Sequence, residues 1–170
     1  MWLLVLIAGA VLGMDIGLKA FTHDSIPVMS ALFPGFPYGG IAVFHDWHGI
    51  DFSINHVINH GAAWGAFGEY GKLLLGLRIA MIVGMAIYLV FYNKKSANKL
   101  PLTLILTGAS ANVLDYFIYG HVVDMFHFNF WGYSFAIFNI ADAAICCGVI
   151  LLLLLPWFAK VTSIQRLKSR

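Results

Sequence analysis

The sequence predicts an all-α membrane protein, a bundle of four transmembrane helices with a small β-sheet outside the membrane. Of its 170 residues, 61% are hydrophobic and only 11% are charged, and the mean hydropathy is +0.83. A soluble domain is about half apolar and about a quarter charged. This composition excludes a soluble globular protein and a disordered chain, and a net charge of +2 does not favour binding to nucleic acid.

Four apolar runs form the predicted spans, at about residues 2–21, 73–92, 100–119 and 135–158 of a single domain covering 1–170. A run of about 20 residues, at 1.5 Å per residue, crosses a hydrocarbon core of about 30 Å. No Lys or Arg precedes the first run and no convincing cleavage site follows it, so a span is favoured over a cleavable signal peptide.

The basic residues predict the orientation of these spans. Seven of the ten lie either in the loop 93–99 or in the tail 159–170, and the positive-inside rule places both segments in the cytoplasm. Both termini are then cytoplasmic, and residues 22–71 and 120–134 are extracytoplasmic. All eight acidic residues and all seven histidines fall on or near that outer side.

The first outer segment is expected to contain the sheet. Apolar residues alternate with polar ones between Gly39 and Ile58, and Gly49 interrupts the alternation. Period-two alternation around a turn residue is typical of two short strands. The second outer segment is expected to be a short loop between the third and fourth spans.

Polar side chains near the outer ends of the spans are the candidate functional residues. Ionisable groups cost roughly 2.5 to 3.5 kcal/mol each at mid-helix and are usually functional. Asn112 and Asp115 are three residues apart, as are Asn139 and Asp142, so each pair shares one helix face. Asp15 and Lys19 have the i, i+4 spacing of a helix-surface ion pair.

Asp124 and Asp142 have the properties of a catalytic carboxyl pair. Asp142 is expected about seven residues into the fourth span, on the order of 10 Å below the helix start. If Asp124 of the short loop lies near Asp142, repulsion between two carboxylates makes ionisation of both unfavourable. The pKa of one then rises, and the pair shares a proton. Water-activated peptide hydrolysis needs one ionised and one protonated carboxyl. The alternative is that these acids form structural ion pairs with Lys19, Arg78 or the histidines.

Five blocks of residues in chain order resemble the lipoprotein signal peptidases, also called signal peptidase II. The blocks are Asp15-x-x-x-Lys19; Asn59-x-Gly61-Ala62-Ala63-Trp64-Gly65; Gly108-x-x-x-Asn112-x-x-Asp115; Val122-Val123-Asp124-Met125; and Phe138-Asn139-x-Ala141-Asp142. They run through most of the chain, and the set is specific although each block alone is weak.

The resemblance implies an aspartic endopeptidase of the bacterial cytoplasmic (inner) membrane, with its site near the outer leaflet. Such enzymes release signal peptides from prolipoproteins by cutting before a diacylglyceryl-modified cysteine, need no metal or cofactor, and are blocked by the cyclic peptide globomycin. Asp124 and Asp142 match the catalytic pair. The residues that match site-supporting positions are Asp15, Lys19, Asn59, Gly61, Asn112, Asp115, Asn139 and Ala141. We expect a monomer in contact with membrane phospholipid.

One position departs from the family pattern. The family usually has Arg after Asp115, whereas this chain has Tyr116. Tyr cannot supply a fixed positive fork. Arg78, about seven residues into the second span, is the candidate to replace it.

Two other functions are compatible with parts of the sequence. A metal-dependent membrane hydrolase could use the outer-side histidines, where His45 and His48 are three apart and His56 and His60 four apart. A small transporter or proton-relay protein could line its path with buried Asp and Asn. The first predicts loss of activity with a chelator, and the second is disfavoured by the lack of an internal repeat.

Overall fold

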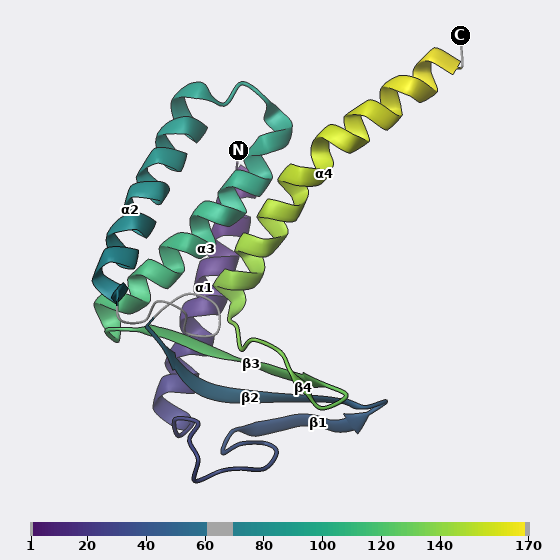
Figure 1. Cartoon of the computed structure of the whole chain (residues 1–170). Coiled ribbons are helices and arrows are strands. Elements are labelled where there is room, and N and C mark those ends of the chain that lie inside the picture. Colours follow the sequence, from purple (N-terminus) through teal and green to yellow (C-terminus); the bar gives the residue numbers. More distant parts are fainter. Residues whose placement is uncertain (1, 61–69, 169–170) are drawn as a thin grey trace.

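The computed structural model describes residues 2–60 and 70–168, with side chains up to residue 155, and within this part the chain forms four helices and one sheet (Figure 1). The helices are α1 (Trp2–Ser25), α2 (Gly71–Ile87), α3 (Lys99–Ile118) and α4 (Ile140–Lys168). A π-helical stretch, Tyr88–Tyr92, continues α2, and a single 3-10 turn, Ser96–Asn98, precedes α3. Helix α3 packs against each of the other three.

Three of the helical segments are long and apolar enough to cross a membrane: Trp2–Ser25, Gly71–Tyr92 and Ser96–Ile118. In α4 the described apolar stretch, Ile140–Leu155, is shorter. No residue of α2 is buried, although the helix is almost entirely apolar. An apolar helix without buried residues is suited to contact with lipid. A membrane fold of several apolar helices with a small antiparallel sheet is thus confirmed, and the count of four spans stays a prediction.

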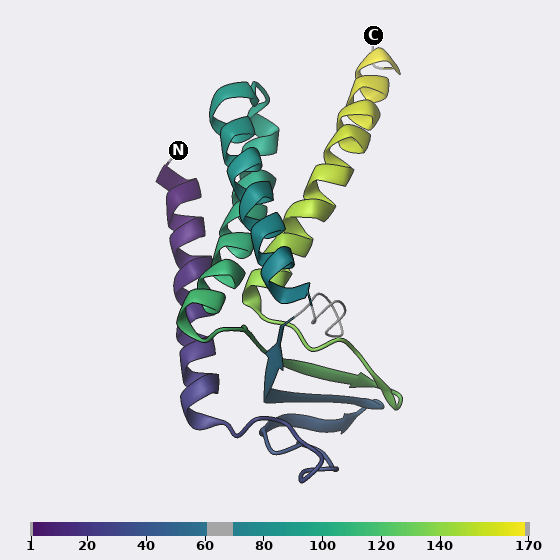
Figure 2. The same ribbon diagram turned by 60° about the vertical axis from the view of Figure 1, so that its left-hand side comes forward.

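The sheet lies across one end of the helices (Figure 2) and is larger than the sequence predicts. It has four antiparallel strands in the order β1 (Ile41–Trp47), β2 (Ile50–Asn59), β3 (Val122–Phe130) and β4 (Tyr133–Ser134). The two strands expected between Gly39 and Ile58 are present. The expectation that 120–134 is only a loop is wrong, because β3 pairs with β2 from Ile50 opposite Phe130 to Asn59 opposite Val122.

Helix α4 begins at Ile140, five residues later than the predicted start of the fourth span. The apolar residues before it are extended against β3: the Phe135 amide donates to the Phe128 carbonyl at 2.9 Å, and the Phe126 amide donates to the Phe138 carbonyl at 2.8 Å. Aromatic side chains of this stretch pack on the sheet, and the ring centres of Phe126 and Phe138 are 5.6 Å apart. Asp142 is therefore in the first turn of α4 and not about seven residues into a helix.

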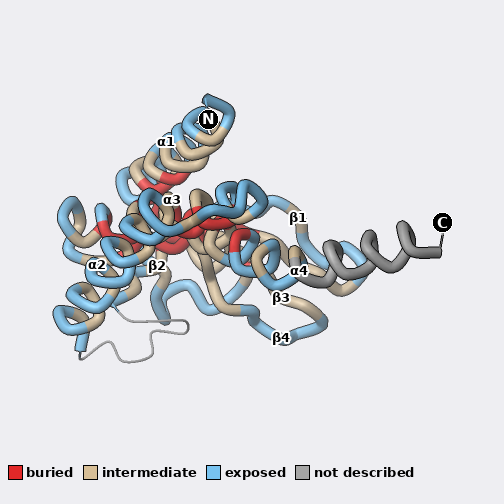
Figure 3. Tube along the Cα trace, turned by 90° about the horizontal axis from the view of Figure 1, so that it is seen from above, coloured by how far each residue is buried: buried red, intermediate tan, exposed pale blue. Residues whose placement is uncertain are grey.

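Seen from above (Figure 3), the buried segments lie in the middle of the molecule, and many of the buried residues are polar. Asp15, Lys19 and Asn139 have no exposed surface, and neither do their apolar neighbours Val123 and Ala141. Buried charges require paired, hydrogen-bonded surroundings. A polar network therefore occupies the junction of the two layers.

Candidate active site

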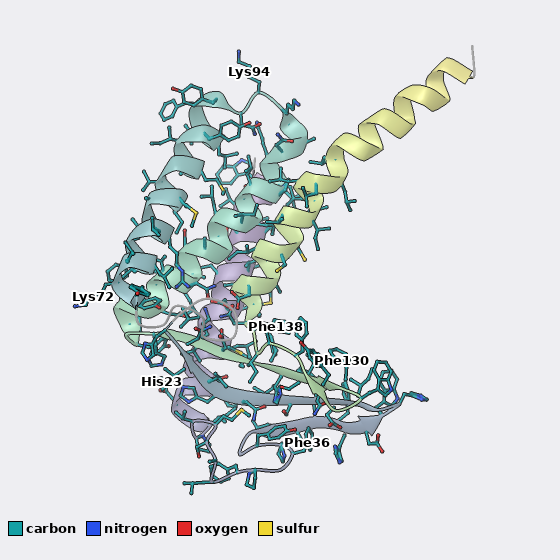
Figure 4. The ribbon with its side chains drawn as sticks, viewed as in Figure 1. His23, Phe36, Lys72, Lys94, Phe130 and Phe138 are labelled. Atoms are coloured by element: carbon teal, nitrogen blue, oxygen red, sulfur yellow. The ribbon has the colours of Figure 1, made fainter. Side chains whose placement is uncertain are left out.

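Asp124 of β3 and Asp142 of α4 line the same cavity, which has a volume of about 700 Å³. Among the described residues, three further polar ones line it, Asn59, Arg78 and Asn112. Most of the wall is apolar and comes from α2, α3, α4 and the extended stretch before α4. Figure 4 shows Phe138, one of the lining residues, where the sheet meets the start of α4. Such a cavity, apolar with a few converging polar groups, is typical of a ligand or substrate site.

Asp124 is held by two side-chain amides. Asn59 Nδ2, at the end of β2, donates to Oδ2 at 2.8 Å, and Asn139 Nδ2 donates to Oδ1 at 2.7 Å. Asp124 is only 2% exposed. Burial, and next the neighbouring Asp142 carboxylate, raise the pKa of Asp124 to about 7, while the hydrogen bonds from the two amides oppose the rise.

Asp142 belongs to the N-terminal cap of α4. The Asp142 amide donates to Asn139 Oδ1 at 2.9 Å, and the Asn139 amide donates back to Asp142 Oδ2 at 3.3 Å. This reciprocal pair is a capping box, with the acid three residues after the capping residue. Asn112 Nδ2 donates to the other carboxylate oxygen, Oδ1, at 2.7 Å. Asn139 therefore contacts both aspartates, Asp142 through its backbone amide and Asp124 through its side chain.

Lys19 pairs with Asp15, as their spacing predicts, but the pair is buried and not on the helix surface, and Lys19 is the centre of a larger ion network. Its ammonium group lies 2.7 Å from Asp15 Oδ2 and 2.7 Å from Asp115 Oδ2, and it donates to Asn112 Oδ1 at 2.9 Å. These three acceptors match the three N–H donors of a lysine. With its oxygen bound to Lys19, Asn112 directs its NH₂ group to Asp142.

The same acids also fix the backbone beside each site aspartate. The Ala141 amide donates to Asp15 Oδ1 at 2.8 Å, and the Val123 amide donates to Asp115 Oδ2 at 3.3 Å. Each of these amides belongs to the residue directly before Asp142 or Asp124. Helices α1 and α3 thus position β3 and α4 through buried charge-assisted hydrogen bonds.

The structure brings together most of the residues singled out from the sequence, and adds one contact. Arg78 lines the cavity, and its guanidinium carbon lies 5.6 Å from the centre of the Tyr116 ring. The Tyr116 hydroxyl donates to the His60 carbonyl, next to Asn59. No pattern in the sequence indicates that hydrogen bond. Gly61, predicted to support the site, lies outside the described residues.

None of the seven histidines, all of them in the described part of the chain, is among the residues that line the cavity. His45 Nδ1 is 2.8 Å from Asp51 Oδ1 near the β1–β2 turn, and His56 Nδ1 is 3.0 Å from the Ile26 carbonyl. In the part of the chain that the structure describes, no group of three or more His, Cys, Asp or Glu side chains is arranged to hold a metal ion.

Comparison with known proteins gives the same family from a family model and from curated relatives. A sequence model described as Signal peptidase (SPase) II matches residues 7–158. A lipoprotein signal peptidase of Chlamydia pneumoniae is 43% identical over 110 residues, covering 64% of this chain and 66% of that protein. One from Chlamydia trachomatis is 39% identical over 116 residues, covering 67% and 70%, and one from Psychromonas ingrahamii is 35% identical over 114 residues, covering 64% and 66%.

Two solved structures, each titled as a bacterial membrane enzyme, share the fold. One has a TM-score of 0.73 at 22% identity and covers 96% of this chain and 92% of its own. The other has a TM-score of 0.70 at 24% identity and covers 91% and 92%.

Proposed function

Because the chain belongs to the signal peptidase II family of membrane proteases, we propose that it removes signal peptides from prolipoproteins, cutting on the N-terminal side of a diacylglyceryl-modified cysteine. Asp124 and Asp142 are the proposed catalytic pair. One observation carries this assignment: the two carboxyl groups line one largely apolar cavity and both bind Asn139.

The raised pKa of Asp124 supports a division of roles within the pair. At neutral pH one carboxyl is ionised and takes a proton from the attacking water, while the other is protonated and donates to the oxygen of the scissile carbonyl. The tetrahedral intermediate then collapses, the peptide C–N bond breaks, and a carboxyl proton goes to the amine of the leaving cysteine. The proton belongs to the pair, since coupled acids titrate jointly.

The supporting residues hold this pair in place. Asn59, Asn112 and Asn139 donate to the carboxylate oxygens, and Lys19, Asp15 and Asp115 fix Asn112 and the backbone beside each aspartate. Preorganised donors of this kind need no rearrangement during the reaction. This chain's own residues supply the acid and the base, so the proposal includes no metal or cofactor.

Membership of the signal peptidase II family and the long apolar helices identify a bacterial membrane protein. We propose four spans, cytoplasmic termini, a site near the outer leaflet of the cytoplasmic membrane, a monomeric state among phospholipids, and inhibition by globomycin-like peptides. The position of Lys94 at the opposite end of the helices from the sheet (Figure 4) supports this orientation. A cysteine introduced at Ser96, with both native cysteines replaced by alanine, should react with an impermeant maleimide only from the cytoplasmic side.

A cleavage assay tests the catalytic assignment. Purified protein is incubated with a diacylglyceryl-modified precursor, and a gel shift reports release of the signal peptide. Asp124→Asn and Asp142→Asn should each abolish cleavage while the protein still inserts, because neither amide can take up or deliver a proton. Appreciable cleavage by either variant contradicts the assignment.

A chelator arm separates the proposal from a metal-dependent hydrolase. Cleavage by the aspartic pair should persist in excess EDTA, whereas a metal site on the outer histidines would lose activity. Cleavage of the precursor by protein in detergent, with no membrane gradient present, would also speak against a transporter or proton relay.

A further inference from the structure

One face of α2 forms a wall of the cavity and carries a single cation. Arg78, Met81, Ile82 and Met85 all line the cavity, at spacings of three, four and seven residues, which place them along one side of a helix. Helix α2 begins beside the sheet and runs away from it (Figure 1), so Arg78 is at the sheet end of this wall and Met85 is deepest. The wall therefore has its cationic residue toward the sheet end and is apolar beyond it.

The chemistry of the wall below Arg78 fits an apolar helix. Two of its three deeper residues are Met, whose flexible thioether side chains adapt to different apolar partners. Leu106 and Ile145 line the opposing sides from α3 and α4. An apolar helix lying in a groove of this kind is a common mode of recognition.

The direction of such a bound helix is set by the site. If Asp124 and Asp142 cut after the helical part of a signal peptide, the C-terminal end of that helix lies at the sheet end of the cavity. A helix C-terminus has up to four carbonyls without intrahelical partners and carries the negative end of the helix dipole. In an apolar cavity these carbonyls need donors, and a guanidinium offers five N–H groups in a fixed plane.

We propose that Arg78 binds the C-terminal carbonyls of the substrate's signal helix and so fixes the register of the scissile bond against the aspartates. This inference rests on the proposed function and deepens it by naming a substrate-binding residue. Tyr116 positions Arg78, since its ring lies 5.6 Å from the guanidinium and its hydroxyl is bound to the His60 carbonyl beside Asn59. Tyr116 thus connects the cation to the end of β2, where Asn59 donates to Asp124.

The test is steady-state cleavage of a diacylglyceryl-modified precursor in detergent by wild type, Arg78→Met, Arg78→Gln and Arg78→Lys. Charge-assisted hydrogen bonds to the substrate are lost in the two neutral variants, so KM should rise about tenfold while kcat changes little. Arg78→Lys keeps the charge but not the planar fork, and its KM should be intermediate. Both neutral substitutions make α2 more apolar, so membrane insertion is not at risk. Testing two neutral side chains of different chemistry shows whether an effect comes from the lost charge or from poor packing of one replacement.

Lys72→Met is the matched control, because Lys72 is an exposed cation on the same helix and does not line the cavity. It should cleave with wild-type KM. An unchanged KM in both neutral Arg78 variants overturns the inference, as does a fall in kcat at constant KM, which would place Arg78 in the chemical step. If wild type itself fails to cleave the precursor, the proposed function fails instead, so the two failures are distinguishable.

Discussion

Replacing Lys19 by Met tests whether the buried ion network holds the site together. The ammonium is fully buried and has three partners, two of which are carboxylates. Met has a similar length and no charge, so the variant leaves Asp15 and Asp115 buried without their cation. Removing one partner of a buried ion pair costs about 3 to 5 kcal/mol. For a chain of this size, each kcal/mol lowers Tm by roughly 2 to 4 °C.

We therefore expect Lys19→Met to unfold roughly 6 to 20 °C below wild type in a thermal scan of detergent-solubilised protein. Cleavage should also be lost, since Asn112 is no longer bound through its oxygen and can turn its NH₂ group away from Asp142. Lys72→Met, at an exposed position, should unfold with wild-type Tm. A Lys19→Met protein as stable as wild type would refute the reasoning.

A charge-balanced variant separates stability from positioning. The triple variant Asp15→Asn, Lys19→Met, Asp115→Asn has no buried charge in the network, and replacing a whole buried ion cluster by neutral residues is often close to neutral for stability. Its Tm should recover most of the loss. Its cleavage should stay low, because no cation fixes the Asn112 amide. Full recovery of cleavage would show that Lys19 has no positioning role.

Four further outcomes are expected. Because the pKa of Asp124 is about 7, cleavage should fall as the pH rises above about 7 and both carboxyls ionise, a fall that a pH–rate profile would detect. That folded-state pKa is above the unfolded value of 3.8, so the ionisation of Asp124 lowers the stability of the wild type increasingly from about pH 4 to about pH 7. The Tm of Asp124→Asn should therefore rise relative to that of the wild type over this range. A Tm difference that does not change with pH would contradict this. Gly108→Ala should lower Tm and cleavage because its methyl group would overlap the Ala141 carbonyl beside Asp142, whereas Gly13→Ala, with open space around it, should do neither. Maleimide should slow cleavage by reacting with Cys146, which lines the cavity, and Cys146→Ala should be resistant, with Cys147→Ala as the sensitive control.

The class of protein, and most of the residues that line or support the site, could be predicted from the sequence. Apolar runs of spanning length predict helices without knowledge of their partners, because lipid leaves the backbone almost no other way to satisfy its hydrogen bonds. Polar residues within such runs identify a functional region for the same energetic reason. Asn112, Asp115, Asn139 and Asp142 stand out on that ground alone.

How those residues contact one another depends on the packing of strands and helices that are far apart in the chain. The sequence predicts a loop at Val122–Phe130, because this strand forms by pairing with β2, and β2 lies more than sixty positions away in the chain. The same pairing places Asp124 on a strand and delays α4 to Ile140, which turns Asn139 and Asp142 from a shared helix face into a capping box. Lys19 binds Asn112 across 93 positions, and no local pattern encodes a contact between helices that depends on how they pack.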